Sequence, residues 1–180
     1  MIFIVGTDHR QQRRAPQILS TSEALLRIER EQKERYTQIL QRYLAQPGRW
    51  FVGEEIEHDV PTFAMELARP PHTYWNIDMS REQRNTAGIP LDYAEEGGND
   101  RYTAEQTGRW NQEREEFMFA EIQERRGDAD RLLIICGAQH AEPIANLFRN
   151  RQELPEVIDL RTEPWFVADW LRAYMEGDEL

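Results

Sequence analysis

The stretch Arg131-Leu132-Leu133-Ile134-Ile135-Cys136-Gly137 decides how this chain folds. Its apolar residues are consecutive rather than alternating, which is typical of a strand buried on both faces of a parallel sheet. Working outward from it, similar runs occupy residues 2–5, 50–53 and 157–160, and a mixed aromatic and polar run occupies 73–78. The sequence therefore predicts about five strands.

Segments with helical periodicity lie between these strands. Ser20-x-x-Glu23, Ser80-x-x-Gln83 and Thr103-x-x-Gln106 are capping boxes, which mark the first turn of a helix. We expect helices over residues 20–46, 62–69, 80–88, 103–126 and 143–147, and from 162 onward, with polar loops at 7–16 and 89–102. Strands that alternate with helices predict an α/β fold, a mainly parallel sheet with helices on both faces, in one domain over residues 1–180.

The amino-acid composition limits the classes of partner that we expect this protein to bind. Of the 180 residues, 33 are Asp or Glu and 22 are Lys or Arg, so the formal net charge is −11. This balance disfavours nucleic acid and anionic membranes as partners. No apolar run approaches the ~20 residues of a membrane span, and the first residues lack the features of a signal peptide. The single cysteine, Cys136, fits a reducing compartment, so we expect a cytoplasmic protein. The sequence is also compatible with a homo-oligomer.

Polar residues follow the predicted strands at the edge where parallel sheets bind ligands. Gly6-Thr7-Asp8-His9 follows the first strand, and Gly137-Ala138-Gln139-His140 follows the 131–136 strand. Glu54 and Glu55 follow the second strand, and Asp78 ends the third. Glycine in both tetrapeptides is expected to let the chain leave the strand with unusual backbone angles. These side chains are predicted to converge.

Two imidazoles and a carboxylate are typical ligands of an open divalent metal site. His9, His140, Glu55 and Asp8 are the candidate ligands, for Mn²⁺, Co²⁺ or Zn²⁺, and such an ion would make a nucleophile of bound water. Glu54 competes with Glu55 as ligand or base, because the exact end of the strand decides which carboxylate points to the site. The structural alternative is that these groups only satisfy helix N-termini.

Arg114 is the candidate for holding an anion. It shares a face of the 103–126 helix with Phe117 and Met118, so it is predicted to reach inward, either as a structural ion pair or as a clamp for a carboxylate or oxyanion. Glu54, Glu55, Arg114 and Asp78 are thus the candidate catalytic residues. Lys33, the only lysine, lies on a predicted polar helix face, which disfavours Schiff-base chemistry.

Together these motifs resemble the TraB/Tiki superfamily, which includes erythromycin-esterase-like and ChaN-like proteins. The resemblance rests on the two Gly-x-x-His motifs, on Glu54 or Glu55, and on Arg114, in that order over roughly residues 1–150. Members usually carry Asn after the arginine, where this chain has Glu115. The resemblance implies an α/β fold and three activities: metal-dependent proteolysis, lactone hydrolysis by His and Glu without a required metal, or haem binding.

The sequence therefore predicts a metal-dependent hydrolase of peptide, ester or amide bonds in small-molecule or peptide substrates. The alternatives are a metal-free His/Glu hydrolase and a non-catalytic protein that binds haem or another small ligand.

Overall fold

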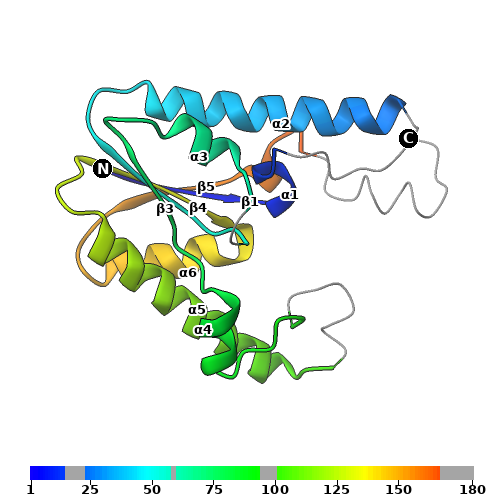
Figure 1. The fold of residues 1–180 in the computed structure, drawn as a ribbon, viewed down its shortest axis with the longest axis vertical. Helices are drawn as coiled ribbons and strands as arrows, with labels where there is room; N and C mark the ends of the chain where they lie inside the picture. The colour runs from blue at the N-terminus through cyan, green and yellow to red at the C-terminus, as the bar shows by residue number, and fades with distance from the viewer. Residues whose placement is uncertain (15–22, 58–59, 94–100, 167–180) are drawn as a thin grey trace.

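A computed structural model describes residues 1–14, 23–57, 60–93 and 101–166 (Figure 1). Five parallel strands form one sheet in the order β3-β2-β4-β1-β5. They are β1 (Ile2–Thr7), β2 (Trp50–Glu54), β3 (Thr73–Asn76), β4 (Arg131–Gly137) and β5 (Pro155–Asp159). The prediction of a mainly parallel sheet of about five strands is confirmed.

The consecutive apolar run of β4 lies at the centre of the sheet, between β2 and β1. Ile134 pairs with Ile4 of β1 and with Gly53 of β2. Residues 132–136 are buried, because helices cover both faces of this strand. The carboxyl ends of all the strands therefore meet at one edge, on the right in Figure 1.

The helices form a layer on each face of the sheet (Figure 1). They are α1 (His9–Gln12), α2 (Glu23–Leu44), α3 (Phe63–Leu67), α4 (Arg81–Thr86), α5 (Ala104–Arg125) and α6 (Ala138–Arg149), with a 3₁₀ helix at Leu160–Thr162. Tyr36 and Leu40 of α2 pack on one face of the sheet. Met118 of α5 and Phe148 of α6 pack on the other. Within the described ranges, no helix has the length and apolar character needed to cross a bilayer.

Three local predictions differ from the structure. Helix α6 begins at Ala138 rather than at Pro143, because Gly137 is its N-cap and Pro143 is accommodated inside the helix. Part of the predicted 7–16 loop is the short helix α1. The predicted exposed loop from Ile89 is anchored, since Ile89 and Tyr93 are each 1% exposed. The capping boxes at Ser80 and Thr103 are confirmed, whereas Ser20 and the predicted helix beyond 166 lie outside the described residues.

Candidate functional site

Glu55 lies at the centre of a polar cluster at the carboxyl edge of the sheet, and it is fully buried. Its N–H donates to the Ile135 carbonyl at 2.8 Å, which continues the β2–β4 ladder by one residue. Arg114 Nη2 donates to its Oε1 at 2.6 Å, and the Gly137 N–H donates to its Oε2 at 2.7 Å. Burial acts to raise the pKa of Glu55, but the charges of His140, His9 and Arg114 together with the Gly137 hydrogen bond lower it to about 2.

Both predicted histidines reach this carboxylate. His140 Nε2 lies 3.6 Å and His9 Nε2 lies 3.8 Å from Glu55 Oε1. The His140 side chain is 0% exposed in the first turn of α6, whereas that of His9, at the start of α1, is 44% exposed. The convergence of His9, His140 and Glu55 follows from the adjacency of β1, β4 and β2 in the sheet. His9 therefore forms the solvent-facing side of the cluster, and His140 forms the enclosed side.

Hydrogen bonds fix which nitrogen of each ring carries a proton. Gln12 Nε2 donates to the Glu55 carbonyl at 3.1 Å, which turns the Gln12 Oε1 toward His9 Nδ1 at 2.6 Å. Because an amide oxygen only accepts, His9 Nδ1 is the donor. His140 Nδ1 faces a Glu115 carboxylate oxygen at 2.8 Å and is the donor there. When neutral, both rings therefore carry their lone pair on Nε2, and that of His140 also lies 3.2 Å from Gln139 Nε2, an amide donor.

Arg114 is a buried structural clamp. Besides Glu55, it donates to Asp78 Oδ1 from Nη2 at 3.0 Å and to the Tyr93 hydroxyl from Nη1 at 2.9 Å. Arg84 pairs with the other oxygen of Asp78. Burial acts to lower the pKa of Arg114, but Glu55 and Asp78 outweigh it and raise the pKa above its ordinary value. Arg114 thus holds Glu55 in place, and the ion pair between Arg114 and Asp78 fixes the position of the guanidinium group.

Glu54 is separated from this cluster by the sheet itself. Its side chain lies on the α2 and α3 face, where Thr62 and Tyr74 donate to Oε2 at 2.6 and 2.8 Å. Its Oε1 is buried, and none of the described residues forms a hydrogen bond with it. Burial raises the pKa of Glu54 to about 7, and the Thr62 and Tyr74 hydrogen bonds only partly oppose that rise. The structure therefore distinguishes the two glutamates: Glu55 faces the histidines and Glu54 does not.

Two further residues that the sequence analysis considered, Asp8 and Cys136, lie within the described ranges. Asp8 is half-buried directly before α1, where its backbone carbonyl accepts the Gln11 N–H at 2.9 Å. Cys136 is a buried core residue, as expected, and burial raises the pKa of its thiol well above the ordinary value. His58 lies outside the described residues.

The glycines of the two Gly-x-x-His motifs are explained by close packing, so the expectation of unusual backbone angles was wrong. The positive-φ glycines of the described ranges are Gly48, Gly88 and Gly127. A Cβ on Gly6 would lie 2.9 Å from the Ala138 Cα. A Cβ on Gly137 would lie 3.3 Å from His9 Nε2 and 3.5 Å from Glu55 Oε2. The absence of a side chain at Gly6 therefore lets α6 pack closely on β1. The absence of a side chain at Gly137 leaves room for His9 and Glu55 in the site.

Sequence reasoning missed Glu115 and Tyr93 as site residues. Glu115 carried a usable signal, because it precedes the buried Phe119 and Ile122 by four and seven residues and so lies on the inner face of α5. Tyr93 could be recognised only as an aromatic residue near the rim, because nothing in its local sequence indicates that its hydroxyl accepts from Arg114 and donates to Asn111 at 2.8 Å.

The donor chemistry suits a divalent ion, but the arrangement does not. Two imidazole nitrogens and a carboxylate are ligands of open zinc and manganese sites. Within the described ranges, however, no group of three or more His, Cys, Asp or Glu side chains is arranged to hold a metal ion. Arg114 also donates to the Glu55 oxygen that faces the two rings. Binding an ion here requires that hydrogen bond or a ring to move.

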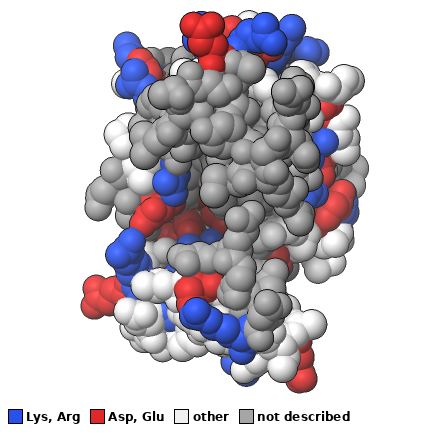
Figure 2. All heavy atoms as spheres, turned by 90° about the vertical axis from the view of Figure 1, so that its right-hand side faces the viewer, with Lys and Arg blue, Asp and Glu red and all other residues white. Residues whose placement is uncertain are grey.

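Charged side chains continue from the cluster to the surface. Figure 2 faces this edge of the sheet and shows acidic and basic atoms side by side in a hollow. Glu57, two residues beyond Glu55, pairs with Arg81 at 2.7 Å and with Arg13 at 3.4 Å. The Arg81 hydrogen bond and the nearby charges of Arg13, Arg81 and Arg84 lower the pKa of Glu57. We refer to His9, Arg13, Glu57 and Arg81 as the mouth of the site.

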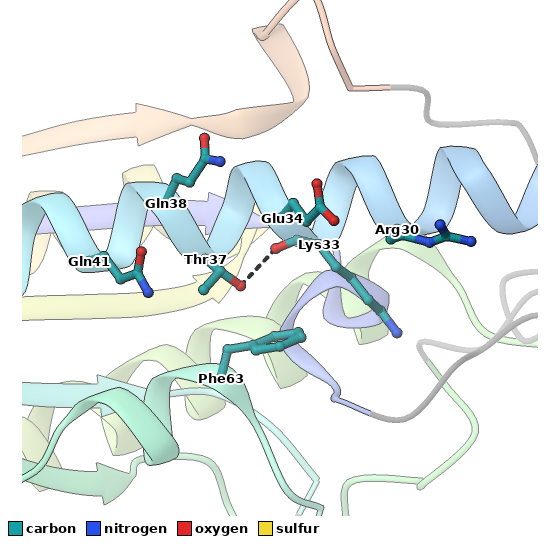
Figure 3. A pocket seen from close by; sticks show the side chains of 7 residues that line it. All are labelled: Arg30, Lys33, Glu34, Thr37, Gln38, Gln41 and Phe63. Atoms are coloured by element: carbon teal, nitrogen blue, oxygen red, sulfur yellow. Dashed lines mark hydrogen bonds between the residues drawn. The ribbon is translucent and has the colours of Figure 1, made fainter.

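A separate groove of about 470 Å³ lies over α2 and α3. Figure 3 shows side chains of α2 around Phe63 of α3, with Thr37 donating to the Lys33 carbonyl. Lys33 is less exposed than its predicted place on a polar helix face suggests: its side chain is 11% exposed, and its Nζ lies 2.7 Å from Glu29 Oε1, one helical turn away. Neither predicted histidine lines this groove.

The cluster is thus a buried glutamate held by an arginine and flanked by two oriented histidines, at the ligand-binding edge of an α/β sheet. Comparison with family models, curated proteins and solved structures gives no match.

Proposed function

We propose that this protein is a hydrolase that cleaves an ester, amide or peptide bond with water, using His140 and His9. The observation that carries the proposal is the 2.8 Å hydrogen bond between Glu115 Oε1 and His140 Nδ1. It holds a buried imidazole with its Nε2 toward Glu55, 3.6 Å away. A carboxylate that orients a histidine and stabilises the imidazolium is a common way to make a general base.

His140 serves as the base. Its Nε2 takes a proton from a water molecule while the water oxygen bonds to the carbonyl carbon of the substrate. The positive charge that forms on the ring is close to Glu115 and Glu55. The Arg114 charge and the Gly137 N–H lower the pKa of Glu55 even when His140 is neutral, so Glu55 stabilises charge as a carboxylate and does not carry the proton.

His9 serves as the acid. The carboxylates of Glu55, Asp78 and Glu115 face the cations of Arg84 and Arg114, so one further positive charge neutralises the cluster. An imidazolium at His9 supplies that charge and donates its Nε2 proton to the leaving oxygen or nitrogen as the bond to carbon breaks. The proton gained by His140 then restores the starting pair.

Backbone donors lie at the same edge. The N-cap of α6 is Gly137, which has no side chain, so this residue offers no side-chain acceptor to the first N–H groups of the twelve-residue helix. Such groups stabilise the oxyanion of a tetrahedral intermediate. Their place beside His140 supports acyl-bond hydrolysis.

The test is turnover of p-nitrophenyl acetate, an acyl p-nitroanilide and a mixed peptide library by the full chain. We expect His140→Asn and His9→Asn each to lower kcat by about 10²-fold or more. Glu142→Gln, at an exposed glutamate on α6, is the control and should match wild type. No turnover of any of the three substrate types, or turnover indifferent to His140→Asn, contradicts the proposal.

The metal-assisted hydrolase is the second candidate, because the Nε2 atoms of both histidines lie near one carboxylate oxygen. His9, His140 and Glu55 would hold the ion after local rearrangement, and the ion would activate water. Chelation separates the candidates. The metal-free reaction survives EDTA, whereas the metal-assisted reaction is lost with EDTA and restored by Mn²⁺, Co²⁺ or Zn²⁺. For both the metal-free and the metal-assisted hydrolase, we propose a small molecule or a peptide as the substrate. We also propose that the protein works in a reducing compartment such as the cytoplasm.

A further inference from the structure

Glu57 joins two arginines that come from opposite sides of the mouth. Arg81, in the first turn of α4, reaches Glu57 Oε1 at 2.7 Å. Arg13, directly after α1, reaches the other oxygen, Oε2, at 3.4 Å. One carboxylate thus spans two guanidinium groups, and its contact with Arg13 is long for a charged hydrogen bond.

Both arginines are anchored beside the catalytic cluster. The backbone of Arg13 pairs with Thr62 in an isolated antiparallel bridge, and Arg13 follows His9 by four residues. On the other side, Arg84 lies one turn after Arg81 and pairs with Asp78, which accepts from Arg114. A group bound between Arg13 and Arg81 therefore lies next to the exposed side of His9.

Among the described residues that form the mouth, two arginines face one glutamate. Arg13 and Arg81 share one carboxylate, in a chain whose formal net charge is −11. The side chains of Arg13, Arg81 and Glu57 are 31, 76 and 47% exposed, so solvent and ligands reach all three. Planar guanidinium groups bind carboxylates and phosphates through paired hydrogen bonds, and Glu57 already shows a carboxylate in that position.

We propose that Arg13 and Arg81 bind an anionic group of the substrate, a carboxylate or a phosphate, and that Glu57 takes the place of this group in the free protein. The proposal rests on the proposed hydrolase function. Substrate binding exchanges Glu57 for the substrate anion, and Glu57 turns into solvent. The substrate class is therefore an ester or amide that carries an acidic group near the bond to be cleaved.

Calorimetric binding of two probes, succinate and inorganic phosphate, tests the anion site without turnover. We expect Arg81→Gln and Arg13→Gln each to weaken the tighter probe about tenfold. Glu57→Gln should strengthen it several-fold, because the competing carboxylate is gone. Arg149→Gln, at an exposed arginine paired with Glu142 on α6, is the matched control and should bind like wild type. Tighter succinate indicates a carboxylate group, and tighter phosphate indicates a phosphate group.

Turnover of the mono-p-nitrophenyl ester of succinate, compared with p-nitrophenyl butyrate, provides the second arm. Arg81→Gln should raise KM for the succinate ester about tenfold and leave the neutral ester unchanged. Failure of both probes to bind wild type and Glu57→Gln, or equal binding by Arg81→Gln and Arg149→Gln, overturns the anion site. Arginine-dependent binding without any turnover instead keeps the anion site and refutes the hydrolase.

Discussion

Glu54 and Glu55 are neighbours in sequence, yet their carboxylates lie on opposite faces of the sheet and have pKa values of about 7 and about 2. Burial is the first influence on both. Glu54 has only hydroxyl partners to oppose it, whereas Glu55 has a guanidinium, two imidazoles and a backbone N–H. One peptide bond thus separates a carboxyl that is partly protonated near neutral pH from one whose pKa lies far below it.

The first prediction concerns the pH dependence of stability. The folded state holds the Glu54 proton more tightly than the unfolded state, so its contribution to stability falls as pH rises from about 4.5 to about 7. Glu54→Gln should therefore raise the free energy of unfolding at pH 8 by an amount on the order of 2 kcal/mol, and change it little at pH 4.5. Urea denaturation at both pH values measures this. An equal effect at both pH values would show that folding does not raise the pKa of Glu54.

The second prediction concerns the buried clamp. Arg114→Met leaves Glu55 without its cation, and breaking a buried ion pair in this way costs about 3–5 kcal/mol. Arg149→Met, at an exposed ion pair, should change stability by less than about 1 kcal/mol. Urea denaturation of both variants at pH 7 makes the comparison. Similar losses in the two variants would mean that the Arg114 network is not the buried one described above.

The third prediction concerns Glu115 as a positioning residue. Glu115→Gln keeps an acceptor for His140 Nδ1 but removes the charge that stabilises the imidazolium, so kcat should fall by about 10²-fold. The acidic limb of the kcat/KM profile should also move to lower pH. A structural role alone would lower the melting temperature without moving that limb. Glu116→Gln, at the adjacent exposed glutamate, is the control.

The fourth prediction compares the two motif glycines. Gly137→Ala places a methyl group 3.3 Å from His9 Nε2, and His9 is exposed enough to move, so activity should fall more than tenfold with little loss of stability. Gly6→Ala meets the α6 backbone at 2.9 Å, so it should lower stability by about 1–3 kcal/mol. Activity assays and thermal melts of both variants show whether each substitution lowers activity, stability or both. The opposite pattern would assign the structural role to Gly137.

The sheet and its edge could be predicted because their signal is local. A run of consecutive apolar residues marks a strand covered on both faces, and the parallel order then brings His9, His140 and Glu55 to one edge. The choice between Glu54 and Glu55 could not be made from alternation. Helices cover both faces, so both side chains are buried, and only their partners distinguish them.

The parts that could not be predicted depend on contacts between distant segments. Tyr93 is buried because Trp110 packs against its ring and Arg114 donates to its hydroxyl. The first turn of α6 packs closely on β1 because Gly6 has no Cβ to meet Ala138, a contact across more than a hundred residues of sequence. Neither contact leaves a mark in the local sequence.

The strand order has a consequence for synthesis on the ribosome. In the sheet, β1 lies between β4 and β5, so the strand that is made first has neighbours that are made last. Until β4 emerges, β1 has no strand to pair with in this sheet, and its apolar residues must be kept from aggregation for most of translation. His9 is likewise synthesised long before His140, which follows β4 in the sequence. The two histidines are therefore brought together only after β4 has been made.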